Sequence, residues 1–405
     1  MSELLSVICI VHTFSTLFYR ETRYFPIAGL SDTGPYTFEL PAQASMLTDT
    51  NSIELHGSVQ ILYYDDEGKA KELGATDLDN VIPVNMLPSA MFNSVEVMAN
   101  GVVVTYISSP IANYKAYLET LLSYNELAMK GHLVAQRFLI DDVGAASNDG
   151  TNLGANQTIR RDWFAKSNKV DFVIPLASDI LRVDKYLIDR LGLTIKLSRT
   201  NDEFLFCCKK TDTKKYFVKI TELFLTCRHI AVKPSFIEHM NKVLDGGKRA
   251  VYPLLRTVLK SRTIGKDEWQ CNVTDLYSGR LPSQIIFGLV ENSAFRGHRQ
   301  LNPFNFKHYN VTSLILMVNS KQFPSVRFQP KFRDSVNESK IMREFAALMS
   351  GIGVNGNEAP LVTLDHFHDG STLWAFDLSP DACTSYHNHK VCTYIHKYLK
   401  VSAEK

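Results

Sequence analysis

The sequence predicts a mainly β protein built from two tandem jelly-roll sandwiches, each carrying one inserted helix. The first observation is that short apolar or alternating runs dominate the 405-residue chain, among them YTFEL, KVDFVIPL, LTIKLSRT, QIIFGLV and VTSLILMV. Most of these runs are bounded by Gly, Pro, Asn or Asp, which is the pattern of β-strands. An α/β enzyme would instead alternate strands with helices, and this chain does not.

The second observation is that few stretches have helical periodicity. Apolar residues recur at helical spacing in residues 111–130, where Tyr114, Tyr117 and Leu121 share one face. Residues 338–351 repeat the pattern and close with a glycine. A weaker helix is predicted over residues 233–245, where a proline stands near the start.

The third observation is an internal repeat. In the first half, the strand SVEVMA is followed by an Asn100-Gly101 turn, a return strand and the helix near residue 111. In the second half, SLILMV is followed by a turn at Asn319, a return strand and the helix near residue 338. Asn-Gly suits the positive φ angles of a two-residue hairpin. One β unit used twice explains this order, and a chance likeness between two hairpins is the alternative.

The repeat divides the chain. We expect an atypical N-terminal arm over residues 1–30, a first jelly roll over 31–210 and a second over 211–405. A chain of this length is too long for one ordinary hydrophobic core. Two units of jelly-roll size fit it, because such a fold closes two sheets over one core without long free edges.

Charge and composition limit the partners. The chain has 44 Lys and Arg against 42 Asp and Glu, so its net charge of +2 gives no field that would draw it to phosphate. No specific nucleic-acid partner is expected. The apolar run LLSVICIVHTF at residues 4–14 is shorter than the ~20 residues of a membrane span. We interpret it as part of the arm, with a signal segment or anchor as the alternative.

No cofactor and no metal are expected. The glycine-rich GIGVNG at 351–356 follows a helix rather than a strand, so it lacks the context of a dinucleotide site. The tail offers weak metal candidates, which are Cys383, His387, His389, Cys392 and His396. Strand alternation would place the first two histidines on one face and the last two candidates on the other, which opposes tetrahedral convergence.

The stretch AFRGHRQLNPFNFKHYNV at residues 294–311 mixes basic and aromatic side chains. Such a mixture suits stacking on single-stranded nucleic acid, but it also suits a structural corner. We predict a corner: Asn302 and Pro303 form a turn, and Phe304 and Phe306 are buried. Arg296 and Arg299 are expected to face solvent or pair with acidic loops, and the pair Asp141 and Asp142 is expected to be solvated.

Several motifs, taken in order, carry a resemblance. VNMLPSAMFNSVEVMANG, YKAYLETLLSY, DFVIPLASDILRVDKYLIDRLGLTIKLSRTNDEF, YPLLRTVLKSRTI, GRLPSQIIFGLVENSAFRGHRQLNPFNFKHYNV and WAFDLSPD together resemble the capsid proteins of Polinton (Maverick) elements and adintovirus-like viruses. The resemblance runs from about Gly34 to Asp381. It implies a double jelly-roll major capsid protein, or hexon, rather than an enzyme.

The resemblance also implies partners and a location. Such proteins form homotrimers, which tile an icosahedral shell as pseudo-hexagonal capsomers beside neighbouring capsomers and vertex or minor capsid proteins. The expected location is the virion, after assembly in the host nucleus or cytoplasm. The alternatives are a single jelly-roll minor capsid (penton) protein, and a β-sandwich that binds a ligand or acts as an enzyme.

Two departures from that family concern the ends. The tail TSYHNHKVCTYIHKYLKVSAEK does not resemble the glycine-led alternating strand that follows the FDLSPD-like motif in the family. The first ~20 residues also lack the family's polar lead-in. We therefore expect altered ends, as in a copy integrated in a host genome, and a second jelly roll without its closing strand.

Overall fold

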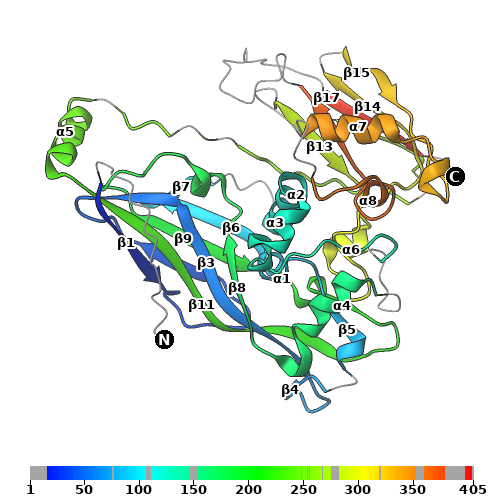
Figure 1. The fold of residues 1–405 in the computed structure, drawn as a ribbon, viewed down its shortest axis with the longest axis horizontal. Helices are drawn as coiled ribbons and strands as arrows, with labels where there is room; N and C mark the ends of the chain where they lie inside the picture. The colour runs from blue at the N-terminus through cyan, green and yellow to red at the C-terminus, as the bar shows by residue number, and fades with distance from the viewer. Residues whose placement is uncertain are drawn as a thin grey trace, which may run out of the picture.

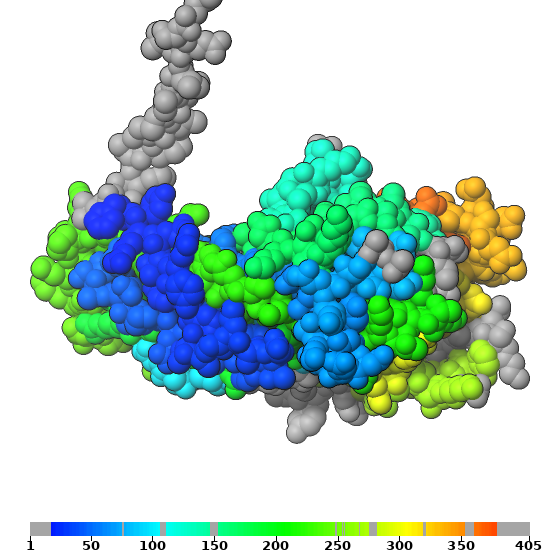
Figure 2. Space-filling model, turned by 90° about the horizontal axis from the view of Figure 1, so that it is seen from below, coloured from blue at the N-terminus to red at the C-terminus, as the bar shows by residue number. Residues whose placement is uncertain are grey.

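The computed structural model describes residues 16–74, 77–105, 111–145, 153–247, 249–252, 254, 256–266, 268–274, 282–318, 321–352, 360–378 and 397–403. The chain forms two β-sandwiches joined by one long connection (Figure 1). Seen from below, the N-terminal strands lie at one end of the molecule and the second sandwich lies at the other (Figure 2).

The first sandwich consists of two antiparallel sheets. One has the order β1 (Thr16–Tyr24), β11 (Lys215–Val232), β3 (Met46–Tyr64) and β4 (Ala70–Glu72), with β8 (Val170–Pro175) also paired to β3. The facing sheet has the order β2 (Tyr36–Leu40), β9 (Leu193–Arg199), β6 (Phe92–Ala99) and β7 (Val102–Val103). At one end β5 (Val81–Pro83) pairs with β10 (Phe206–Cys208).

Alternation along these strands creates the core. In β2, β8 and β9 every second side chain is buried, because successive side chains point to opposite faces of a sheet. Leu55, Ile195, Leu197 and Leu225 are completely buried between the two sheets. Each such side chain stabilises the fold by about 1.5–3 kcal/mol relative to leaving it exposed.

Four helices belong to the first sandwich, and α1 (Leu87–Ala90) lies between β5 and β6. The connection between β7 and β8 holds α2 (Ala112–Ser123), α3 (Glu126–Lys130) and α4 (Ala155–Asp162). The single helix expected over 111–130 is divided, because the backbone is extended at Tyr124 and Asn125. The Asn125 side chain caps α3 by accepting the amide of Ala128 at 2.9 Å.

One sheet of the second sandwich repeats the strand order of one sheet of the first. One sheet runs β12 (Gln270–Thr274), β17 (Lys397–Ala403), β14 (Val311–Val318) and β15 (Lys321–Phe328), and the other pairs β13 (Gln284–Gly288) with β16 (Leu373–Asp377). Its helices are α6 (Asn292–Arg296), α7 (Met342–Gly351) and α8 (Leu364–His368). The corresponding strands also follow one another in the same order along the chain: β12 corresponds to β2, β14 to β6, β15 to β7 and β17 to β9. In the same way, β13 corresponds to β3 and β16 to β8.

Two boundaries and one strand differ from the sequence-based expectations. The strand β11, expected in the second unit, pairs along its length with β3 of the first, so the expected boundary at residues 210 and 211 is wrong. The expected arm over 1–30 includes β1, which pairs with β11. The closing strand expected to be missing is present, because β17 lies between β12 and β14.

The connection between the sandwiches begins with α5 (Pro234–Asp245) and continues as irregular chain to β12. It follows the surface of the first sandwich (Figure 1). The amide of Thr257 donates to Asp179 at 2.9 Å, and the Tyr252 hydroxyl accepts from the amide of Ile188 at 3.1 Å. These contacts attach a long connection to one body.

Candidate functional site: the joint and the cleft between the sandwiches

The loop of residues 302–306 joins the second sandwich to the first. Phe304 stacks on Tyr117 of α2 with ring centroids 4.2 Å apart and planes 8° apart, and Tyr114 and Phe204 meet it edge-on. The Tyr114 hydroxyl donates to the Pro303 carbonyl at 2.8 Å. Burial raises the pKa of Tyr114 and Tyr117 above the usual range, so both hydroxyls stay neutral. The joint is therefore an aromatic cluster shared by both sandwiches.

A buried carboxylate forms the polar part of the joint. Asp141 is 6% exposed and pairs with Arg160, which is 3% exposed and also donates to the Leu139 carbonyl at 2.7 Å. Asn302 of the second sandwich donates to the other oxygen of Asp141 at 2.8 Å. The expectation that Asp141 is a solvated loop residue is wrong, because α4 places the guanidinium of Arg160 against it and removes both groups from water.

Asn302 has two roles that fix the corner. Its side-chain oxygen accepts the amide of Phe304 at 3.0 Å, which forms a turn of the kind that asparagine favours. Its side-chain amide reaches Asp141 across the joint. The sequence indicated the turn but not the partner, since no local pattern relates residues 161 positions apart.

The basic side chains of the corner stretch lie at its edge. Phe304 and Phe306 are buried, whereas Arg296 is exposed. Arg299 is half-buried and donates to the Lys214 carbonyl at 2.7 Å, so its partner is backbone rather than an acidic loop. Just before it, α6 ends at Arg296 and is followed by the cap Gly297, whose φ of +94° and close approach to Phe204 oppose a larger side chain.

Two further hydrogen bonds cross the joint. Asp369, which follows α8, accepts the amide of Gly144 at 3.0 Å, and the Tyr124 carbonyl accepts the amide of Leu361 at 3.0 Å. The His366 ring lies near Asp141, and burial lowers its pKa more than the nearby carboxylates raise it. The joint thus combines rings, an ion pair and backbone contacts from both sandwiches.

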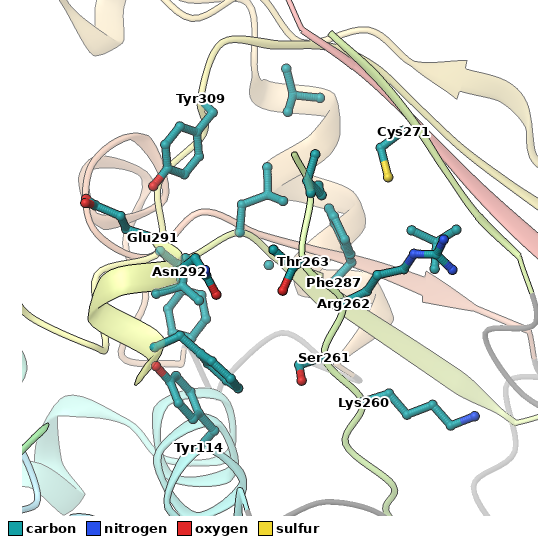
Figure 3. A pocket seen from close by; sticks show the side chains of 18 of the residues that line it. Tyr114, Lys260, Ser261, Arg262, Thr263, Cys271, Phe287, Glu291, Asn292 and Tyr309 are labelled. Atoms are coloured by element: carbon teal, nitrogen blue, oxygen red, sulfur yellow. The ribbon is translucent and has the colours of Figure 1, made fainter. Parts of the chain in front are cut away.

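Beside the joint lies a large open cleft of about 1270 Å³. Figure 3 shows Tyr309, Glu291 and Asn292 on one side of it and Ser261, Arg262 and Thr263 on the other. Its walls are mainly apolar and include residues of α2, the connection, β12, β13 and β16, among them Leu118, Leu259, Ile286, Phe287 and Leu373. Sequence patterns gave no sign of this cleft, because it forms where separate segments meet.

The other residues singled out from the sequence lie elsewhere. Asn100 and Gly101 form the turn between β6 and β7 with φ values of +47° and +79°. Asn319 lies outside the described residues, as do the tail candidates Cys383, His387, His389, Cys392 and His396. In the ranges that are described, no three His, Cys, Asp or Glu side chains are grouped so as to hold a metal ion. None of the described helices is both long and apolar enough to cross a membrane.

Comparison with known proteins identifies the fold. No family model matches the chain. An uncharacterized protein of Caenorhabditis elegans is 21% identical over 306 residues, covering 74% of this chain and 69% of that protein. A chain in the structure of the Sputnik virophage aligns with a TM-score of 0.55 at 11% identity, over 99% of this chain and 84% of its own length.

A chain of the PBCV-1 virus capsid aligns with a TM-score of 0.52 at 7% identity, over 98% of this chain and 86% of that one. These virophage and PBCV-1 proteins are double jelly-roll capsid proteins. Both alignments span nearly the whole chain, so the likeness covers both sandwiches and the connection. The chain therefore has the double jelly-roll fold, which confirms the fold class predicted from the sequence.

Proposed function

We propose that this protein is a structural major capsid protein whose two jelly rolls form one rigid tile of an icosahedral shell. The observation that carries the proposal is the repeated sheet order, β2-β9-β6-β7 and β12-β17-β14-β15, in a chain that aligns with virophage and PBCV-1 capsid proteins over nearly its full length. A capsid protein acts through its rigid shape rather than through reactive side chains, and two packed β-sandwiches provide such a shape.

The joint gives the tile its rigidity. Two sandwiches linked only by a flexible connection would move independently. The weak contacts of one chain with its neighbours could not then form at the same time, and the avidity of the shell would be lost. Here the Phe304 cluster and the Asp141–Asn302 hydrogen bond hold the second sandwich on the first. In this proposal, the role of the corner stretch is structural and needs no nucleic acid.

The finer features of the proposal follow from the family resemblance. We propose that three copies form a pseudo-hexagonal capsomer, that capsomers contact one another and vertex or minor capsid proteins, and that the assembled protein resides in a virion. We also propose a Polinton or adintovirus-like origin, with an endogenous copy in a host genome as one source. Assembly would take place in the host nucleus or cytoplasm.

Sedimentation of the purified protein over a range of concentrations tests the proposal. We expect a reversible or stable species with the mass of three chains, each of 45.7 kDa. A protein that remains monomeric at every concentration, both alone and with salts that promote capsid assembly, would contradict a capsid role. Sedimentation of the Asp141→Ala variant in parallel shows whether an intact joint is required for association.

A further inference from the structure

One edge of β13 borders the cleft without a neighbouring strand among the described residues. On its other edge, the Leu378 amide donates to the Ser283 carbonyl at 2.7 Å, in the register that pairs Gln284 with Asp377. Hydrogen bonding alternates along an antiparallel strand. The backbone groups of Gln284, Ile286 and Gly288 therefore point to the free edge, and the last two residues line the cleft.

The first sandwich shows what such an edge normally holds. There β3, the counterpart of β13, has β8 on one edge and β11 on the other. In the second sandwich β16 takes the place of β8, and within the described ranges no strand takes the place of β11. Free edges favour addition of a further strand, because each unpaired N–H and C=O needs a partner. The cleft thus lies where the repeat predicts a strand.

The walls of the cleft define the chemistry of that strand. Ile111, Leu118, Leu289 and Val290 present apolar surface beside the free edge, and Arg262 and Glu291 stand on opposite sides (Figure 3). An extended segment with apolar, β-branched side chains would satisfy both the backbone groups and the apolar walls, as in recognition by strand addition.

We propose that the segment of residues 4–14 from a second copy of this chain adds to the free edge of β13 and fills the cleft. This segment, LLSVICIVHTF, is apolar and rich in β-branched residues, which favour strands. The chain offers a competitor in residues 379–396, but SPDACTSYHNHKVCTYIH carries two histidines near its centre, a third at its end, a lysine and an aspartate. Its polarity suits the apolar walls less well.

The position of β1 assigns the segment to a neighbouring copy. β1 begins at Thr16 and lies on the first sandwich at the end away from the second, as both views show (Figures 1 and 2). Exchange of the same element between copies links them head to tail, and such contacts close into rings when the rotation fits. The inference rests on the proposed capsid role, because it supplies one contact by which copies would associate.

Two native cysteines provide the test. Cys9 lies within the proposed donor segment, and Cys271 of β12 lines the cleft. The full-length protein is treated with a short bis-maleimide at a concentration where oligomers are present, separated by denaturing electrophoresis and mapped by mass spectrometry. We expect a Cys9–Cys271 link in the two-chain band, reduced by about tenfold or more in both Cys9→Ser and Cys271→Ser.

The other outcomes separate this inference from the proposed function. Oligomers without that link would overturn the inference alone. A Cys9–Cys271 link found only within single chains would overturn the role of a second copy, and a link from Cys271 to Cys383 or Cys392 would assign the cleft to residues 379–396 instead. A protein that forms no oligomer at all would overturn the capsid proposal and this inference together.

A pair of variants tests the chemistry of the segment. Ile8→Asp combined with Ile10→Asp places charges where apolar contact is proposed, and we expect the yield of the inter-chain link to fall by about tenfold or more. The control is Val326→Asp on β15, an apolar residue that is 59% exposed. We expect this control to leave the link unchanged, and an equal loss in both variants would contradict the inference.

Discussion

The two sandwiches share one strand order but bury their apolar side chains differently. The first builds a large core between its own sheets, whereas the separate core described for the second comprises Val311, Leu314, Leu316, Val318, Phe328, Trp374, Phe376 and Leu378. Other buried residues of the second, including Phe304, Phe306 and Leu373, pack into the core of the first. A duplicated fold has therefore not produced two independent domains, because the second relies on the first.

The largest effect is expected at the buried ion pair. Asp141→Ala leaves the Arg160 guanidinium buried without its carboxylate and removes the acceptor of Asn302, which should lower the free energy of unfolding by about 3–5 kcal/mol. Chemical denaturation monitored by circular dichroism measures this. The control is Asp171→Ala, which removes an ion pair whose carboxylate is 93% exposed and should change stability little.

The aromatic part of the joint gives a second large effect. Phe304→Ala removes a completely buried ring that stacks on Tyr117, and we expect a loss of about 3–5 kcal/mol in the free energy of unfolding. Arg299→Ala removes one hydrogen bond to backbone and should cost about 0.5–1.5 kcal/mol. Phe236→Ala on α5, where the ring is 51% exposed, is the matched control.

The reverse ranking of Phe304→Ala and Arg299→Ala would contradict a structural corner. If it came with salt-sensitive binding of single-stranded DNA, it would favour the nucleic-acid interpretation of the stretch instead. Titration of a fluorescent oligonucleotide at two salt concentrations would complete that comparison.

Asn302→Ala should have an intermediate effect. It leaves an oxygen of Asp141 without this donor and removes the acceptor for the Phe304 amide, so we expect a loss of about 1–3 kcal/mol. Asn305 is equally buried in the same loop, but its side-chain oxygen has no hydrogen-bond partner. Thermal unfolding should therefore show a smaller shift for Asn305→Ala, and equal shifts would deny a special role to Asn302.

These positions show how far the sequence predicts the structure. Alternation and turn residues predicted the strands around Asn100 and the duplicated order, since both are local properties of the chain. The boundary after residue 210 was misplaced, because the sequence of β11 predicts a strand but does not show which sheet it joins, and only its pairing with β3 does. The buried contacts of Asp141 were not predicted for the same reason, because its partners Arg160 and Asn302 lie on α4 and in the second sandwich.

The smallest expected effect concerns pH and the edge of the first sandwich. His229 of β11 lies between Tyr24 of β1 and Thr48 of β3, with contacts of 2.7 and 3.1 Å, and burial lowers its pKa. The nearby Arg20 lowers it further. The unfolded chain then binds a proton more readily, so stability is greatest above about pH 6.5, falls as the pH drops from there towards the lower folded pKa, and levels off below it.

Urea unfolding at a series of pH values between 7.5 and about 5 measures this dependence. We expect His229→Gln to flatten the loss of stability on acidification, because glutamine does not titrate. The remaining slope would report other buried histidines with lowered pKa values, such as His56 and His308. An unchanged slope in the variant would mean that His229 does not contribute to the acid sensitivity.

Electron microscopy of the purified protein tests the central claim most directly. If the two sandwiches form one rigid tile, particles should contain three chains and show a six-lobed, pseudo-hexagonal outline, because each chain contributes two jelly rolls of similar shape. Particles with three lobes, or single chains whose two lobes take up many relative orientations, would contradict a duplicated capsid tile held together by the joint.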